Sequence, residues 1–236
     1  MLKLNNRPWN SNISWQIAFI LTAIMLAFNM LLPSLFMKLV SCKVLLYFLF
    51  SVPNLLAFAA AFYVKQTLYK EEKLSDLLGI KKITLKDIKS VFLTWFLVML
   101  IFIPAMILWK VFLVYFNIPY SEQQPLVLLI KEASFIELGI LLFLVSVTAP
   151  LTEEIFLRRF LYAGIEELTN MRMAIILTSI VFAIAHFYLL GLPGLLILGF
   201  AFQILYLSTN NLLNPILLHC FFNTTSLLAT RFLEVQ

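Results

Sequence analysis

Two long stretches of this 236-residue chain contain no Asp, Glu, Lys or Arg: residues 8–37 and residues 173–230. A helix needs about 20 predominantly apolar residues to cross the hydrocarbon core of a bilayer. Hydrophobic residues make up 62% of the chain and charged residues only 12%, more than one small water-soluble core explains. The sequence therefore predicts an all-α, polytopic membrane helical bundle, with residues 1–236 forming a single integral membrane domain.

The apolar segments indicate about seven membrane-spanning helices. Four are predicted at Pro8–Met37, about Val44–Val64, about Ser90–Phe116 and from Ser134 onward. The turn signals at Gly191–Gly194 and Thr209–Asn211 divide the C-terminal apolar stretch into three more. Because the residue before a proline is pushed away from the helical region, we expect a break or kink in the fourth helix near Ala149, with Pro150 beginning a new helical segment.

Residues 65–90 form the one strongly polar region, with seven lysines against four acids. Their Leu and Ile spacing suits a short amphipathic helix lying at the membrane interface. Lysine-rich loops face the cytoplasm, so this loop and the N-terminus are predicted to be cytoplasmic. The net charge of +5 concentrates here rather than on a basic tail or helix face, so no nucleic-acid partner is expected. Cys42 and Cys220 are interpreted as packing residues.

Three short fragments interrupt this apolar pattern. They are EEIFLR (Glu153, Glu154, Arg158), FAIAH (Phe182 to His186) and HCFFN (His219 to Asn223). A four-residue offset places two side chains on one helix face, so Glu154 and Arg158 are predicted to form an ion pair. Glu153 is then the free carboxylate and a candidate general base.

The two histidines extend this hypothesis. His186 could help Glu153 position and deprotonate a water molecule, and His219 with Asn223 could donate hydrogen bonds to a developing oxyanion. Such a set fits peptide hydrolysis. A divalent metal such as zinc, held by Glu153, His186 and His219, is the alternative, although the HExxH spacing is absent. We expect no cofactor and place direct water activation ahead of a metal.

Simpler interpretations exist for each fragment. The acids could be first-turn residues favoured by a helix dipole, with Arg158 and Arg159 as cytoplasmic flanking charges. A lone intramembrane histidine more often bonds two helices together than catalyses a reaction. Phe182 is interpreted as a packing residue. Two histidines, each in a four-residue pair, favour the catalytic interpretation.

The ordered set EExxxR, FxxxH and HxxxN resembles the CPBP family of CAAX proteases and bacteriocin-processing proteins, also called the Abi family. The resemblance covers residues 145–228, the expected catalytic core. It implies an all-helical intramembrane endopeptidase whose eukaryotic members cleave after a prenylated cysteine. Glu153 then matches the water-activating base and His186 its partner. The supporting positions match Glu154 and Arg158, and the oxyanion-stabilising motif matches His219 and Asn223.

The expected substrate is a small hydrophobic peptide, or a lipidated or membrane-tethered precursor such as a bacteriocin or pheromone. The expected location is the cell membrane of a bacterium. A non-enzymatic bacteriocin-immunity protein is the second hypothesis. A proton-coupled transporter is the third, and the absence of an internal repeat counts against it.

Overall fold

The computed structural model describes residues 73–122 and 125–232, together with residues 52, 55, 58, 59, 62, 63 and 66. The predicted spans at Pro8–Met37 and Val44–Val64 lie outside the continuous described ranges, as does the first part of the lysine-rich loop. The described residues are helical and include no strand, which confirms the all-α fold class.

The helices follow one another with short connections. Their bounds are α3 (Leu74–Leu78), α4 (Leu85–Tyr115), α5 (Pro125–Glu132), α6 (Phe135–Phe143), η1 (Leu144–Thr148), α7 (Ala149–Glu154), η2 (Ile155–Leu161), α8 (Tyr162–Leu168), α9 (Met171–Ile184), α10 (Leu192–Thr209) and α11 (Leu213–Phe232). By length and hydropathy, the helices at 85–115, 135–168 and 192–209 can each cross a membrane. The turn between α10 and α11 lies where the sequence predicted it. The turn between α9 and α10 occupies residues 185–191, earlier than the predicted Gly191–Gly194, and residues 192–194 form the first turn of α10.

The helix predicted from Ser90 begins five residues earlier, at Leu85. Thr84 caps it: its hydroxyl accepts from the Asp87 backbone N–H, and the Asp87 carboxylate accepts from the Thr84 backbone N–H. This reciprocal arrangement satisfies two backbone donors that a helix start otherwise leaves unpaired. The polar residues 85–89 therefore belong to the first turns of α4 rather than to a separate interfacial helix. A helix at 125–132 was not predicted.

The segment from α6 to α8 is one continuous helix of 34 residues, Phe135–Leu168. Of the predicted break or kink near Ala149, the break is wrong, since Ala149 keeps helical dihedrals of φ −64° and ψ −52°. The irregularity takes the form of two π-helical turns, η1 before Pro150 and η2 after Glu154. A π-helical turn bonds each N–H to the carbonyl five residues back, so the chain passes a proline without ending the helix.

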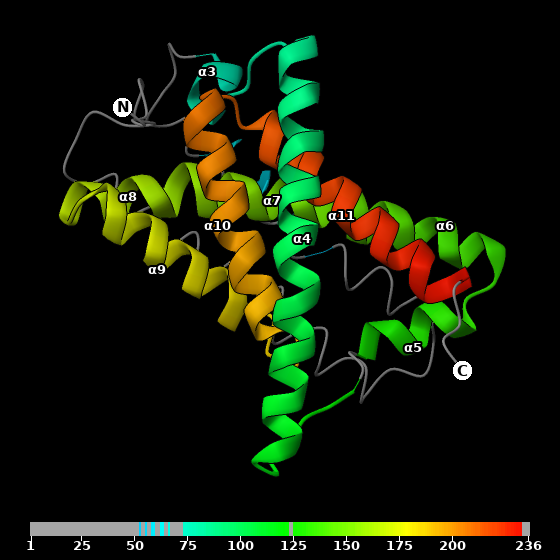
Figure 1. Cartoon of the computed structure of the whole chain (residues 1–236). Helices are drawn as coiled ribbons and strands as arrows, with labels where there is room; N and C mark the ends of the chain where they lie inside the picture. The colour runs from blue at the N-terminus through cyan, green and yellow to red at the C-terminus, as the bar shows by residue number, and fades with distance from the viewer. Residues whose placement is uncertain are drawn as a thin grey trace.

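The core lies where α10 packs against α4, α9 and α11 and where η2 packs against α9 and α10. In Figure 1, α10 lies beside α4, and the composite helix of α6, α7 and α8 crosses behind them. Gly199 permits the close contact between α10 and α9, because a Cβ there would lie 3.0 Å from the Ser179 Cα. This packing buries the three fragments singled out above at one shared centre.

Candidate active site

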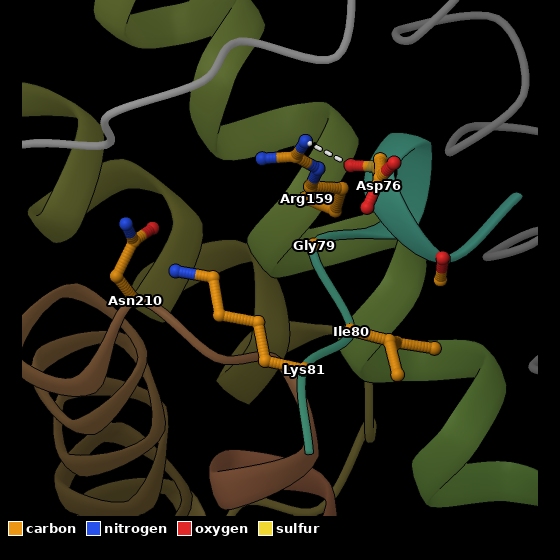
Figure 2. Close-up of a pocket in the computed structure, with 7 residues that line it drawn as sticks. Asp76, Gly79, Ile80, Lys81, Arg159 and Asn210 are labelled. Atoms are coloured by element: carbon orange, nitrogen blue, oxygen red, sulfur yellow. Dashed lines mark hydrogen bonds between the residues drawn. The ribbon is translucent and has the colours of Figure 1, made fainter. Parts of the chain in front are cut away.

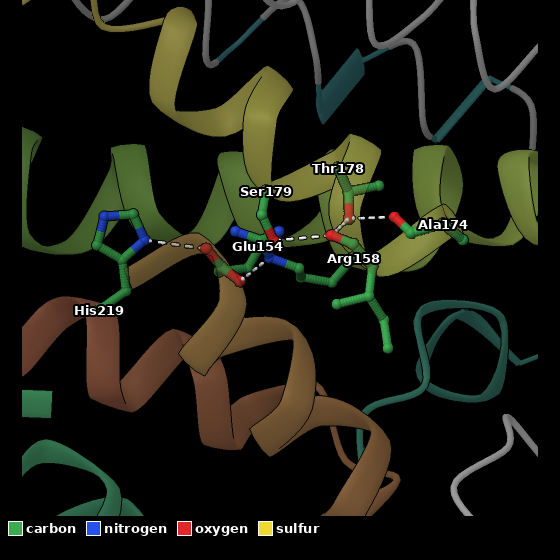
Figure 3. A network of polar contacts seen from close by, with 7 residues as sticks. Glu154, Arg158, Ala174, Thr178, Ser179 and His219 are labelled. Atoms are coloured by element: carbon green, nitrogen blue, oxygen red, sulfur yellow. Dashed lines mark hydrogen bonds and ion pairs between the residues drawn. The ribbon is translucent and has the colours of Figure 1, made fainter. Parts of the chain in front are cut away.

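The centre of the site is a buried ion-pair network formed by Glu154, Arg158 and His219 (Figure 3). The Arg158 Nε donates to Glu154 Oε2 at 3.0 Å, which confirms the predicted pair one helical turn apart. The second carboxylate oxygen accepts from His219 Nδ1, also at 3.0 Å. The side chains of Glu154 and Arg158 are fully buried. Both oxygens of Glu154 are therefore occupied by cationic or N–H partners from two different helices.

Two phenylalanines enclose the Arg158 guanidinium. Its central carbon lies 5.2 Å from the ring centroid of Phe182 and 5.8 Å from that of Phe202. The ring faces carry partial negative charge, so they attract a cation from which water has been excluded. The two Nη atoms are buried and have no hydrogen-bond partner among the described residues. Arg158 thus depends on Glu154 and on these rings for compensation of its charge.

His219 is fixed in orientation from three sides. Its ring stacks on Phe202 with centroids 4.6 Å apart and meets Phe182 edge to face at 5.7 Å. Because Nδ1 is used by Glu154, only Nε2 remains to contact another group. The Glu154 carboxylate holds Nδ1 and so directs Nε2 away from Glu154. Any hydrogen bond from this residue to a substrate therefore has to come from Nε2.

His186 lies just after α9, in the turn that leads to α10, rather than within a helix. Its Nδ1 donates to the Phe182 carbonyl oxygen at 2.7 Å, and its ring meets the Phe182 ring at 4.8 Å. A carbonyl oxygen can only accept, so Nδ1 carries a proton and Nε2 is the ring nitrogen left for another contact. The two imidazoles consequently pack against the same phenylalanine.

The turn that carries His186 is held from outside by α4 and the loop after it. Trp109 Nε1 donates to the Leu189 carbonyl at 2.9 Å. The Tyr188 hydroxyl donates to the Glu122 carbonyl at 2.9 Å. Phe187 adopts φ +45°, a left-handed conformation that is costly for a side chain with a Cβ. These anchors help to hold the strained turn in place.

Asn223 makes a hydrogen bond that is explained by Pro150, which has no backbone N–H to donate. In η1 the Ala149 N–H bonds the Leu144 carbonyl, five residues back. The next donor in this register would be the N–H of residue 150 to the Val145 carbonyl, but proline has none. Asn223 Nδ2 donates to this carbonyl instead, at 2.9 Å. One amide hydrogen of Asn223 is therefore used structurally, and the other remains for the predicted oxyanion contact.

Glu153 differs from Glu154 both in its burial and in its hydrogen-bond partners. The residue is half-buried, and its Oε2 is enclosed with no hydrogen-bond partner among the described residues. Within the same described part of the chain, no hydrogen bond joins it to His186, the partner that the sequence predicted. An enclosed carboxylate oxygen without a donor has an unused capacity to accept a proton. Of the two adjacent acids, it is Glu153 that keeps this capacity.

The predicted alternative is a metal ion held by Glu153, His186 and His219. Across the residues that the structure describes, no three His, Cys, Asp or Glu side chains converge into a group that could hold a metal ion. Glu153, His186 and His219 are thus not gathered as a ligand set.

Sequence reasoning missed two features of the site. Phe182 was interpreted as packing, and it does pack, but its partners are Arg158, His186 and His219. Arg159 was considered only in the alternative interpretation, as a cytoplasmic flanking charge, yet it is only 2% exposed. The signal for Arg159 was its place within an otherwise apolar helix, where a charge requires a partner.

Comparison with known proteins identifies the same region. The profile of "Type II CAAX prenyl endopeptidase Rce1-like" proteins matches residues 135–225. A Bacillus subtilis (strain 168) protein named "Putative membrane peptidase YdiL" is 34% identical over 79 residues. That alignment covers 34% of this chain and 32% of the relative, so the chain spans about a third of the relative's length. No solved structure matches.

Residues 135–225 contain all three motifs in the order given above. Their members are Glu153, Glu154, Arg158, His186, His219 and Asn223. The helices long and apolar enough to cross a bilayer agree with a membrane protein of this kind. Residues 135–225 of this chain are therefore similar to the Rce1-like type II CAAX prenyl endopeptidases.

Proposed function

We propose that the chain is an intramembrane endopeptidase that hydrolyses a peptide bond with a water molecule activated by Glu153. One observation carries the proposal. Two adjacent glutamates have opposite environments: both oxygens of Glu154 are bound, whereas Oε2 of Glu153 is enclosed and receives no hydrogen bond from the residues that the structure describes. A base has to be free to take a proton, and Glu153 meets that requirement.

The proposed reaction assigns one task to each side chain. Glu153 removes a proton from water as the oxygen attacks the peptide carbonyl, and later gives this proton to the leaving amine. His186 accepts a hydrogen bond from the same water at Nε2, since Nδ1 is used by the Phe182 carbonyl. The carbonyl oxygen then carries negative charge. His219 Nε2 and the second amide hydrogen of Asn223 donate to it.

Glu154 and Arg158 act in this proposal by positioning. Glu154 holds the His219 ring by Nδ1, so that Nε2 faces the reacting oxygen. Arg158 balances the charge of Glu154 in a buried setting where an isolated carboxylate would be costly. Neither residue touches the substrate in this scheme.

The proposed substrate is a hydrophobic or membrane-tethered peptide, either of CAAX type or a bacteriocin or pheromone precursor. Support comes from the family description, which names CAAX prenyl endopeptidases, and from the apolar helices around the site. The proposed location is a bacterial cell membrane crossed several times, with the N-terminus cytoplasmic. The lysine-rich loop supports this orientation.

The test is cleavage of quenched hydrophobic peptides, with and without a lipidated cysteine, by the full chain in nanodiscs. We expect the wild type to cleave and Glu153→Gln to be inactive, because an amide cannot accept the proton. Activity that survives a chelator supports a glutamate-activated water. Loss of activity with chelator, restored by zinc, would replace this mechanism with a metal. Bacteriocin protection that survives Glu153→Gln would favour a non-enzymatic immunity protein.

A further inference from the structure

The lysine-rich segment at residues 73–89, here called the interface segment, is attached to the end of the bundle where α10 and α11 meet. The Leu212 N–H donates to the Gly79 carbonyl at 3.0 Å, and the Lys81 N–H donates to Asn211 Oδ1 at 3.0 Å. The Asn211 amide donates back to the Lys81 carbonyl at 3.3 Å. These bonds use the backbone of the interface segment and leave the Lys81 side chain out of them.

Arg159 ties the same segment to the helix that bears the active-site glutamates. Its Nε and Nη2 donate to the carbonyls of Leu77 and Asp76, at 2.7 and 3.0 Å. Its Nη1 donates to the Tyr206 hydroxyl at 3.1 Å. Gly79, at φ +67°, passes so close that a Cβ would lie 3.0 Å from this hydroxyl oxygen. The guanidinium is thus held rigidly at the end of the bundle.

A cavity of about 50 Å³ opens between these elements (Figure 2). Its lining is Ser75, Asp76, Gly79, Ile80, Lys81, Arg159 and Asn210. A single water molecule needs roughly 10–15 Å³ of space for its centre, so the cavity has room for a group of several oxygen atoms. In Figure 2 the Lys81 ammonium extends toward the side that holds Arg159 and Asn210.

The charge of the lining selects the kind of ligand. Lys81 and Arg159 against Asp76 leave a formal charge of +1. Among the described residues, no carboxylate lies within ion-pair distance of the Lys81 ammonium. An ammonium, a guanidinium and an amide are donors suited to a phosphate group. We propose that this cavity binds the phosphate of an anionic phospholipid headgroup.

The position in the fold identifies the lipid as the source of the phosphate. α4 begins at Leu85 and α10 ends at Thr209, so the cavity lies where two spanning helices reach the membrane surface. Lys73, Lys82 and Lys86 of the interface segment are exposed. Basic pockets at the ends of spanning helices are typical sites for anionic headgroups. This proposal is independent of the catalytic proposal.

The test is thermal unfolding of the full chain in dodecyl maltoside with three additives: short-chain phosphatidylglycerol, the matching diacylglycerol and inorganic phosphate. We expect phosphatidylglycerol to raise the unfolding temperature in a saturable way, by about 3 °C or more, and diacylglycerol to have no effect. An equal rise with inorganic phosphate at the same concentration would overturn the lipid assignment and leave a site for the free anion.

Three variants locate the binding. Lys81→Gln should abolish the rise, and it should fold, because only the backbone of this residue is bonded. Lys82→Gln is the matched control, since it removes the same charge one residue away from the cavity lining. Asp76→Asn should lower the phosphatidylglycerol concentration at which half of the rise in unfolding temperature is reached. The substitution removes the one acid in the cavity lining, which would repel the anionic headgroup. An equal response in Lys81→Gln and Lys82→Gln, or no rise in wild type, would overturn the proposal.

Discussion

Helix α4 and the composite helix at 135–168 are both long enough to cross a bilayer, yet they are built in opposite ways. α4 has 31 residues, of which only Val91, Val98 and Leu113 are buried, and large apolar side chains cover its exposed faces. The composite helix has two π-helical turns and buries Glu154, Arg158 and Arg159. The exposed apolar side chains of α4 need no charge-compensating partner, whereas the buried charges of the composite helix depend on particular partners.

The difference teaches that apolar length specifies a span, whereas buried polar groups specify a site. Lipid-facing apolar side chains have many equivalent replacements, because the bilayer is as apolar as they are. A buried charge has few, because removal of one partner leaves the other uncompensated. Substitutions in the composite helix should therefore cost much more than substitutions on the exposed faces of α4.

The largest stability effect is expected for Arg158→Ala. The variant leaves the Glu154 carboxylate fully buried without its cation, which costs about 3–5 kcal/mol when a buried pair is broken. We expect a low yield of folded protein and a lower unfolding temperature in detergent. Arg158→Lys should recover part of the loss, because it restores the charge but not the Nε geometry. Wild-type stability of the alanine variant would show that the pair does not stabilise the fold.

His219→Ala is expected to have the next largest effect, on rate. Loss of one donor to a developing oxyanion costs roughly 10²- to 10³-fold in kcat. The substrate should still bind, so KM should change little. His219→Gln keeps a donor near Nε2 and should be the less impaired variant. Equal activity of wild type and His219→Ala would remove the residue from the reaction.

Asn223→Ala separates a structural role from a catalytic one. The variant leaves the Val145 carbonyl without its donor, which costs about 1–3 kcal/mol of stability. Adding Pro150→Ala supplies a backbone N–H in the right register and should return much of this stability. The rate should not return if Asn223 also binds the oxyanion. Recovery of both stability and rate in the double variant would make the role purely structural.

The smallest effect is expected for Phe96→Ala on α4. The side chain is 55% exposed, so its removal leaves no enclosed cavity. We expect a change in unfolding free energy within about 0.5 kcal/mol and unchanged cleavage. Val98→Ala on the same helix is the buried counterpart, at 5% exposure, and should cost more. A large loss with Phe96→Ala would mean that this face of α4 is not freely exchangeable.

The sequence was sufficient for features that depend on local spacing. The asparagine signal located the turn between α10 and α11, and the four-residue offset predicted the pairing of Glu154 with Arg158. The capping residue Ser134 begins α6 as expected, with a reciprocal bond to Glu137. Such features involve residues within one or two helical turns.

Features that depend on distant partners were not predictable. The carbonyls that bind Arg159 lie 82 and 83 residues earlier in the chain, and Asn223 meets Val145 across 78 residues. The π register that allows the helix to continue past Pro150 leaves no mark in hydropathy. The role of Phe182 depends on the convergence of three helices on one ring. Tertiary packing determines the contacts of Arg159, Asn223 and Phe182.

The most direct measurement of the central claim compares Glu153→Gln with Glu154→Gln, since each removes one carboxylate from neighbouring positions. Cleavage of a peptide substrate and the unfolding temperature are measured on both purified proteins. The account predicts that Glu153→Gln loses cleavage but unfolds like wild type, whereas Glu154→Gln unfolds at a clearly lower temperature. Cleavage by Glu153→Gln at the wild-type rate, or equal loss of stability in both variants, would contradict the division of roles between the two acids.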